Sequence, residues 1–222
     1  MPTSKDLHGN APDDAEVALL LLDVINDLEF EGGDRLLEHA RSMAPRLAAL
    51  KVRCRRAGIP TVYVNDNLGH WQSDLRRLIH HCAHDGVRGE PVAAALAPDE
   101  SDYFVLKPKH SGFYATPLAL LLEHLSVRTL ILAGVAGDNW VLFTAHDAYL
   151  RDYRLFVPRD CVASIDPRHN TAALAYMERV LEVDTRPAAK IDLGRLNARP
   201  GSRRKASAVS APRKRAPRLR SK

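Results

Sequence analysis

Three polar segments of this sequence each follow a short apolar run, and together their residue types could perform acid–base chemistry. Asp23 follows the apolar run VALLLL, Lys107 follows the strand-like YFVL, and the segment GVAGDNW from Gly134 to Trp140 follows TLILA. A carboxylate can transfer a proton, and an ammonium can bind substrate charge. Backbone N–H groups at the start of a helix can stabilise an oxyanion. These segments are therefore the first candidates for a functional site.

Each segment also has a purely structural interpretation. Asp23 and Lys107 could form a buried ion pair, because burial raises the pKa of a carboxyl group unless a cation compensates. Gly134 could permit a sharp turn in an ordinary loop, with Asp138 or Asn139 capping the helix that follows. Position in the sequence leaves both interpretations open.

Strand-like and helical patterns alternate along the chain and would bring these segments together. Strands are expected at 17–22, 59–64, 103–106, 129–133 and 155–157, and helices at 36–50, 71–84, 116–125, 138–150 and 171–183. Residues 86–102 are predicted to be a loop, and Pro45 should kink or restart the first helix. The alternation predicts a single doubly wound, Rossmann-like α/β/α domain with a mostly parallel sheet. Ligands bind at the carboxyl ends of the strands in such folds, where all three segments fall.

Composition places the chain among ordinary globular proteins. It has 222 residues, of which 45% are hydrophobic and 27% are charged. No apolar run approaches the ~20 residues that span a bilayer, and no signal peptide opens the sequence, so we expect a cytoplasmic protein without a membrane span. Cys54, Cys82 and Cys161 are widely spaced and indicate neither a disulfide framework nor a structural zinc site.

Charge is distributed unevenly along the chain. Of the 32 Lys and Arg residues, 11 lie within 195–222, which contains none of the 27 acidic residues, so this segment carries +11 and the preceding chain −6. We predict a polar N-terminal segment at 1–16, a folded domain at 17–190 and a disordered basic tail at 195–222. The tail would contact a polyanion or act as a solubilising extension.

Three motifs, in order and in register, resemble those of the isochorismatase-like cysteine hydrolase superfamily. They are LLLLDVINDL around Asp23, VLKPKHSGFYATPL around Lys107 and LILAGVAGDNWVLFTAHDAYLRDY around Trp140. The resemblance covers about residues 17–183. The superfamily includes isochorismatases, nicotinamidases and N-carbamoylsarcosine amidases. The resemblance implies an α/β/α fold, a small-molecule substrate and assembly into a homo-oligomer.

The resemblance also implies roles for individual residues. Asp23 matches the aspartate that acts as general base, and Lys107 matches the lysine that favours ionised forms and polarises the substrate. A cis peptide bond is implied between Val135 and Ala136, where it would turn an amide toward the oxyanion. Asn139 belongs to the same oxyanion segment.

One position departs from the pattern of the amidases. Trp140 stands where they carry the nucleophilic cysteine, which excludes thioester chemistry through that position. Cys161 follows the fifth predicted strand at the correct edge of the sheet, so it is the remaining candidate for a displaced nucleophile. The alternative interpretation is that Cys161 is a small buried residue without a chemical role.

The remaining site predictions concern the pocket rim and a metal. Asn65, Asp66 and Phe113 are predicted at the rim of the pocket. Nicotinamidases hold a metal with an Asp-x-His pair, whereas Asp66 and His70 have a different spacing, and the histidines at 80, 81 and 84 suit a solvated helix face. We therefore expect neither a metal nor another cofactor.

Two functional hypotheses follow. The first is a hydrolase that acts non-covalently, through Asp23 and Lys107, on a small planar or carboxylated substrate, since isochorismatases also work without the cysteine. The second is a catalytically inactive pseudo-hydrolase that serves as a ligand-binding or scaffold protein, with Trp140 filling the pocket.

Overall fold

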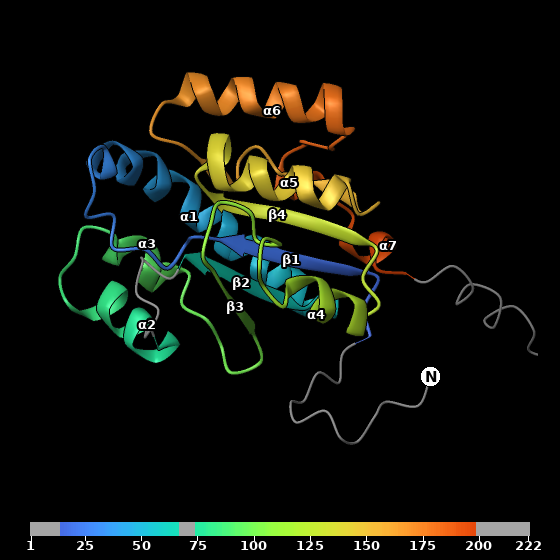
Figure 1. Cartoon of the computed structure of the whole chain (residues 1–222), viewed down its shortest axis with the longest axis horizontal. Coiled ribbons are helices and arrows are strands. Elements are labelled where there is room, and N and C mark those ends of the chain that lie inside the picture. Colours follow the sequence, from blue (N-terminus) through green and yellow to red (C-terminus); the bar gives the residue numbers. More distant parts are fainter. Residues whose placement is uncertain (1–13, 67–73, 199–222) are drawn as a thin grey trace, which may run out of the picture.

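The centre of the molecule is a six-stranded parallel sheet (Figure 1). It is seen in a computed structural model that describes residues 14–66 and 74–198. The strand order is β3-β2-β1-β4-β5, and β6 also pairs with β4. The strands are β1 (Val17–Leu22), β2 (Thr61–Asp66), β3 (Tyr103–Lys107), β4 (Thr129–Val135), β5 (Arg154–Phe156) and β6 (Val162–Ala163). Because the order reverses at β1 and β4, a crevice for a ligand is expected at their carboxyl ends.

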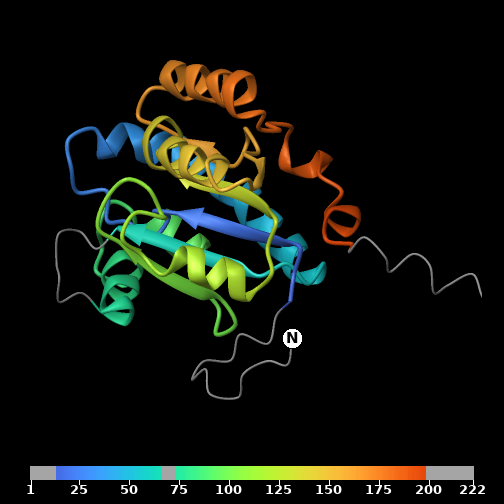
Figure 2. The same cartoon turned by 45° about the vertical axis from the view of Figure 1, so that its right-hand side comes forward.

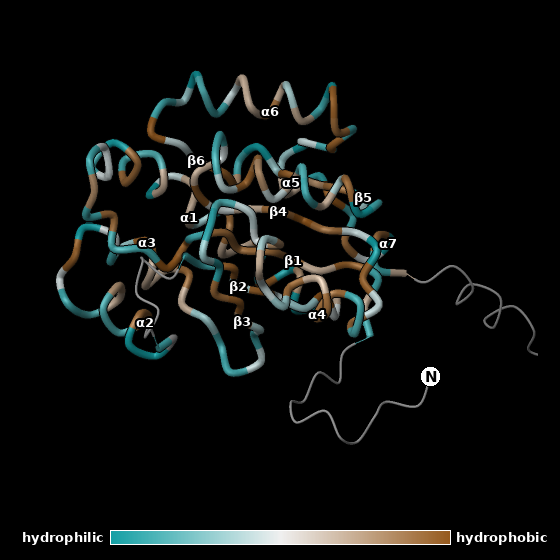
Figure 3. The backbone as a smooth tube through the Cα atoms, in the orientation of Figure 1, coloured by the Kyte–Doolittle hydropathy of each residue, from teal (hydrophilic) through white to brown (hydrophobic). Residues whose placement is uncertain are grey.

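Helices cover both faces of this sheet, as Figures 1 and 2 show. Odd-numbered residues of β1 pack against α1, α2 and α3, whereas even-numbered ones pack against α4, α5 and α6. Both sets are fully buried, which explains the unbroken apolar run (Figure 3). The helices are α1 (Gly33–Arg56), α2 (Leu75–His84), α3 (Glu90–Ala95), α4 (Leu118–His124), η1 (Gly137–Val141), α5 (Leu142–Tyr149), α6 (Pro167–Leu181), η2 (Ala188–Lys190) and α7 (Leu193–Leu196).

The predicted α/β class and mostly parallel sheet are confirmed, but several local predictions are wrong. Pro45 does not restart the first helix, because Met43 and Leu47 on either side of it are both buried in the core and hold α1 together. The predicted loop at 86–102 contains α3, which begins at Glu90 with Pro in its first turn, where proline costs no hydrogen bond. Strand β6 and the short helices η2 and α7 give too little periodicity to be predicted.

Gly134 lies inside β4 and not in a turn. Its φ is 121°, and a Cβ atom there would come within 2.1 Å of the carbonyl oxygen of Leu22. Glycine is therefore required by the close approach of β4 to β1, and not by a change of chain direction.

The folded body extends beyond the predicted end at residue 190. The Asn197 side chain donates to the carbonyl of Ala57 (3.0 Å) and accepts the N–H of Val17 (3.2 Å). Ordered structure thus reaches into the segment that was predicted as a tail from residue 195. Residues 199–222 of that tail, residues 1–13 and His70 lie outside the described residues. None of the helices in the described ranges is long and apolar enough to cross a membrane.

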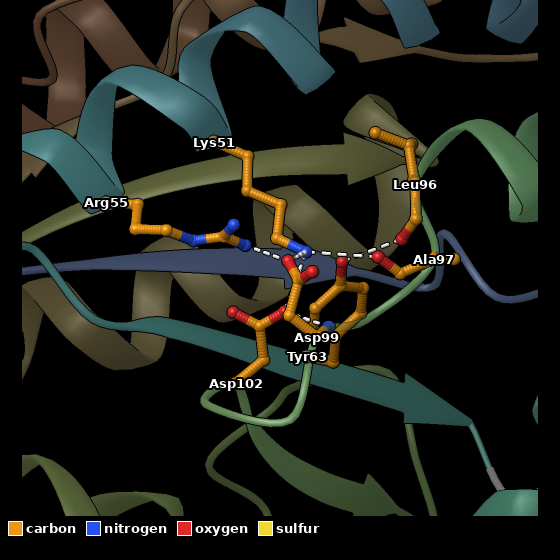
Figure 4. Close-up of polar contacts among 7 residues, drawn as sticks. All are labelled: Lys51, Arg55, Tyr63, Leu96, Ala97, Asp99 and Asp102. Carbon is orange, nitrogen blue, oxygen red and sulfur yellow. Dashed lines mark hydrogen bonds and ion pairs between the residues drawn. The ribbon is translucent and has the colours of Figure 1, made fainter.

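A cluster of ion pairs links the loop before β3 to α1 (Figure 4). The sequence did not predict this cluster. We call Lys51, Arg55, Asp99 and Asp102 the Lys51 cluster. Lys51 Nζ lies 2.9 Å from Asp99, 2.6 Å from Asp102 and 3.0 Å from the carbonyl oxygen of Ala97. Arg55 also pairs with Asp99. The three partners of Nζ match the three protons of an ammonium group.

Candidate functional site

Asp23 and Lys107 meet at the carboxyl edge of the sheet. Asp23 directly follows β1 and has a φ of 49°, a left-handed conformation that Asp tolerates better than most residues. Lys107 is the last residue of β3, and its Nζ lies 2.8 Å from Asp23 Oδ2. Both side chains are 0% exposed. The parallel sheet thus brings together two residues that are far apart in the sequence.

Asp66, the last residue of the intervening strand β2, completes what we call the Lys107 cluster. Its backbone N–H donates to Asp23 Oδ1 at 2.6 Å, and its carboxylate lies 3.6 Å from Lys107 Nζ. Although Nζ is close to two carboxylates, it makes no hydrogen bond of regular geometry, nor does Asp23 Oδ2. The cluster is therefore paired electrostatically but incompletely hydrogen-bonded.

Burial raises the pKa of Asp23 to about 6, although the charge of Lys107 and the N–H of Asp66 partly offset that rise. Near neutral pH this carboxyl group can gain or lose a proton. By its pKa alone, Asp23 is suited to general acid–base chemistry.

Trp140 lies beside this cluster, in the π-helical turn η1 that leads into α5. Its ring centroid is 5.1 Å from Lys107 Nζ, a cation–π distance. Trp140 also lines a pocket of about 780 Å³, whereas neither Asp23 nor Lys107 reaches the pocket wall. The indole therefore contacts both the ion pair and the pocket, while the ion pair stays hidden.

The segment before Trp140 is only partly available to a ligand. The peptide bond between Val135 and Ala136 is cis, as the motif implied. The N–H of Asp138 donates to Ser164 Oγ (3.1 Å), and that of Asn139 donates to the carbonyl of Ala136 (3.2 Å). Two of the N–H groups expected to face an oxyanion are thus already engaged.

Comparison with known proteins identifies the family. The model of the isochorismatase domain matches residues 17–186. This chain belongs to the isochorismatase family. It is 42% identical to an uncharacterized isochorismatase family protein of Bacillus subtilis (strain 168), over 75% of this chain and 91% of that protein. It is 28% identical to a probable inactive nicotinamidase of Arabidopsis thaliana, over 73% of this chain and 88% of that protein.

Solved structures agree with this assignment. The N-carbamoylsarcosine amidase from Thermoplasma acidophilum superposes with a TM-score of 0.61 at 29% identity, covering 80% of this chain and 99% of that one. An isochorismatase family protein from Desulfovibrio vulgaris gives a TM-score of 0.64 at 25% identity, and the match covers 79% of this chain and 95% of that one. The resemblance seen in the three motifs is therefore confirmed at the level of the family.

The remaining predicted site residues of this isochorismatase-family chain separate into two groups. Asp66, Ala136 and Asn139 line the pocket together with Trp140. Asn65 and Phe113, predicted at the rim, do not line it. Asn65 is buried and donates to the carbonyl of Ile25, and Phe113 is buried in the core on the α4 and α5 face, because their positions point them away from the pocket. Val135 is also buried, in the core on the α1 face, and does not line the pocket.

Several pocket residues were not predicted, although they lie within or next to the motifs. Asp27 and Phe30 come shortly after Asp23, His110 belongs to the lysine motif, and Asp138 and Phe143 flank Trp140. The motif segments thus indicated the right stretches of chain. Nothing in their spacing indicated which side chains would face the pocket.

The cysteines offer no substitute nucleophile in this family member. Cys54, Cys82 and Cys161 are all 0% exposed, and burial raises the pKa of each thiol to about 12. Since the thiolate is the reactive form, Cys161 fits the small buried residue and not the displaced nucleophile. In the described ranges, no group of three or more His, Cys, Asp or Glu residues could hold a metal ion.

Proposed function

We propose that this isochorismatase-family protein binds a small planar molecule in the pocket beside Trp140 and does not hydrolyse it. The observation that carries this proposal is the complete burial of Asp23 and Lys107 behind a pocket wall to which Trp140 belongs. A general acid or base must come within about 3 Å of the atom it serves, and the pocket offers neither residue at its surface.

Three further observations support binding without covalent hydrolysis. The three thiols are buried, and two N–H groups of the oxyanion segment already have partners. The indole of Trp140 supplies a flat apolar surface suited to stacking on a planar ligand. A 28% identical relative is itself described as a probable inactive nicotinamidase.

Non-covalent hydrolysis through Asp23 and Lys107 is the second candidate, favoured by one observation. The pKa of Asp23 is raised to about 6, which suits an acid that protonates a substrate. This function requires the indole of Trp140 to move so that substrate reaches the ion pair. A planar or carboxylated substrate remains the prediction for this candidate.

One experiment distinguishes the two candidates. The purified full chain and a Trp140→Cys variant are incubated with a panel of amides, esters and vinyl ethers, and Phe143→Cys, at a neighbouring pocket position, serves as the matched control. We expect no turnover by the unmodified protein, and amide hydrolysis to appear only in Trp140→Cys. Turnover by the unmodified protein that is lost in Asp23→Asn would overturn the binding proposal in favour of the second candidate.

The assembly and tail predictions also stay proposals. We propose a homo-oligomer, to be tested by light scattering of the full chain. Polyanion contact through the segment of charge +11 predicts binding with a steep salt dependence. That binding should vanish when residues 199–222 are deleted, and salt-independent binding would dismiss the idea.

A further inference from the structure

The charges around the pocket are negative. Three carboxylates line it, those of Asp27, Asp66 and Asp138, and their side chains are 22%, 27% and 28% exposed. Among the described residues that line the pocket, there is no Lys or Arg, and His110 is the only side chain able to carry a positive charge. A carboxylated ligand would therefore meet like charges on several sides.

The buried ammonium of Lys107 does not reverse this balance. Its Nζ is 2.8 Å from the carboxylate of Asp23 and 3.6 Å from that of Asp66, so two acids face one base. Three basic side chains lie near the pocket but outside its lining. His81 is 3.7 Å from Asp27, and His169 is 3.9 Å from Asp138, both with exposed rings. Arg88 donates to the carbonyl of Leu28 and is paired with Glu29. The contacts of the two histidines with Asp27 and Asp138 are long and solvated, so these two carboxylates can still attract a cationic ligand.

Aromatic rings form much of the remaining wall. Trp140, Phe30 and Phe143 line the pocket, and the ring of Phe143 is tilted by 40° against that of His110, with 5.2 Å between the ring centroids. Phe30 and Phe143 are 37% and 52% exposed, which is unusual for residues that prefer burial. Aromatic faces attract cations and flat rings, and carboxylates next to them strengthen the attraction for a positive charge.

We propose that the ligand of this pocket is a flat, positively charged molecule, of the class of N-alkylated pyridinium ions, and that the pocket discriminates against carboxylates. This inference rests on the proposed binding function and specifies its ligand class. It reverses the ligand charge that the sequence suggested, because the lysine that would have bound a carboxylate is covered and already neutralised.

The test uses three probes that share one pyridine ring and differ in charge. Binding of 1-methylnicotinamide (cationic), nicotinamide (neutral) and nicotinate (anionic) is measured by titration calorimetry with the full chain at low salt. We expect the cation to bind about ten-fold more tightly than the neutral amide, and nicotinate to bind most weakly. Raising the salt to about 0.5 M should reduce the preference, because salt screens the carboxylates.

Carboxylate variants locate the effect. Asp27→Asn and Asp138→Asn should each weaken binding of the cation about three-fold while leaving nicotinamide unchanged. Asp147→Asn is the matched control, since Asp147 lies on α5, pairs with Arg151 and does not line the pocket. In the Asp147→Asn variant, the affinities for 1-methylnicotinamide and for nicotinamide should both stay unchanged.

Each contrary outcome is informative. Equal affinity for the cation and the neutral amide, or tighter binding of nicotinate, overturns the charge preference and leaves the binding function standing. If none of the three probes binds, the inference of a cationic ligand is overturned. The turnover panel described above then decides separately whether the protein is a hydrolase.

Discussion

A buried lysine lies near each end of the short strand β3, Lys51 of α1 at one end and Lys107 at the other, and the clusters around them differ in how completely they are paired. At its amino end, Lys51 Nζ contacts a carbonyl and two carboxylates within 3.0 Å. At its carboxyl end, Lys107 Nζ faces Asp23, Asp66 and an indole ring, without a hydrogen bond of regular geometry.

Polar atoms without a regular hydrogen bond gather at one end of the sheet. Among the described residues, the buried side-chain atoms of this kind belong to Asp23, Asn65, Lys107 and Asn139, all at the carboxyl end. Asp23 and Lys107 offset this lack by their ion pair, whereas the amide oxygens of Asn65 and Asn139 each cost about 1–3 kcal/mol. The Lys51 cluster contains none of these atoms, which is typical of a cluster with a structural role. The carboxyl end, in contrast, has polar atoms that the fold does not use for its own hydrogen bonds.

The largest expected effect separates the two lysines. Lys51→Met should lower the free energy of unfolding by about 3 kcal/mol, because it leaves the nearly buried carboxylate of Asp102 without its cation. Lys107→Met should cost less than half as much, because Asp23 can then take up a proton. Denaturant unfolding measures both, with the exposed Lys109→Met as control. Equal losses would remove the distinction between the clusters.

Removing the indole should have the next largest effect. Trp140→Ala should destabilise the protein by about 2 kcal/mol, less than for a fully buried aromatic residue, because Trp140 is only partly buried. Water admitted to the Lys107 cluster should also lower the pKa of Asp23 toward its usual range. Carboxyl NMR titration checks this, and an unchanged pKa would show that Trp140 does not shield the cluster. Trp140→Phe should keep most of the shielding.

The pH dependence of the free energy of unfolding should report the protonation state of the Asp23 carboxyl group. Its pKa is raised to about 6 in the folded protein, so the native state binds this proton more tightly than the unfolded chain does. The stability that protonation contributes is complete below about pH 4 and is lost as the pH rises through about 6. The difference in unfolding free energy, native protein minus Asp23→Asn, should therefore fall between about pH 4 and about pH 7. A constant difference would contradict the raised pKa.

The smallest effect concerns the exposed arm of the Lys51 cluster. Arg55 and Asp99 pair with side chains that are 49% and 48% exposed. Arg55→Ala should therefore change the free energy of unfolding by no more than about 0.5 kcal/mol, since solvent screens such a pair. A loss as large as that of Lys51→Met would mean that the whole cluster acts as one unit.

Much of the fold could be predicted because its signals are local. The apolar run of β1 and the alternation of strands and helices indicated a parallel sheet, and a parallel sheet places strand ends along one edge. The convergence of Asp23 and Lys107 follows from that rule. Short elements such as α3 and β6 escaped prediction because two to six residues contain too little of a period to recognise.

The sequence by itself determined the class of fold, the family motifs and the absence of a cysteine at position 140. Only the tertiary structure decided that Trp140 lies over Lys107, that Asp23 is hidden from the pocket, and that carboxylates and not cations line its wall. It alone also paired Lys51 with the loop before β3. These outcomes depend on which side chains meet when segments distant in the chain pack together, and no local pattern encodes such a meeting.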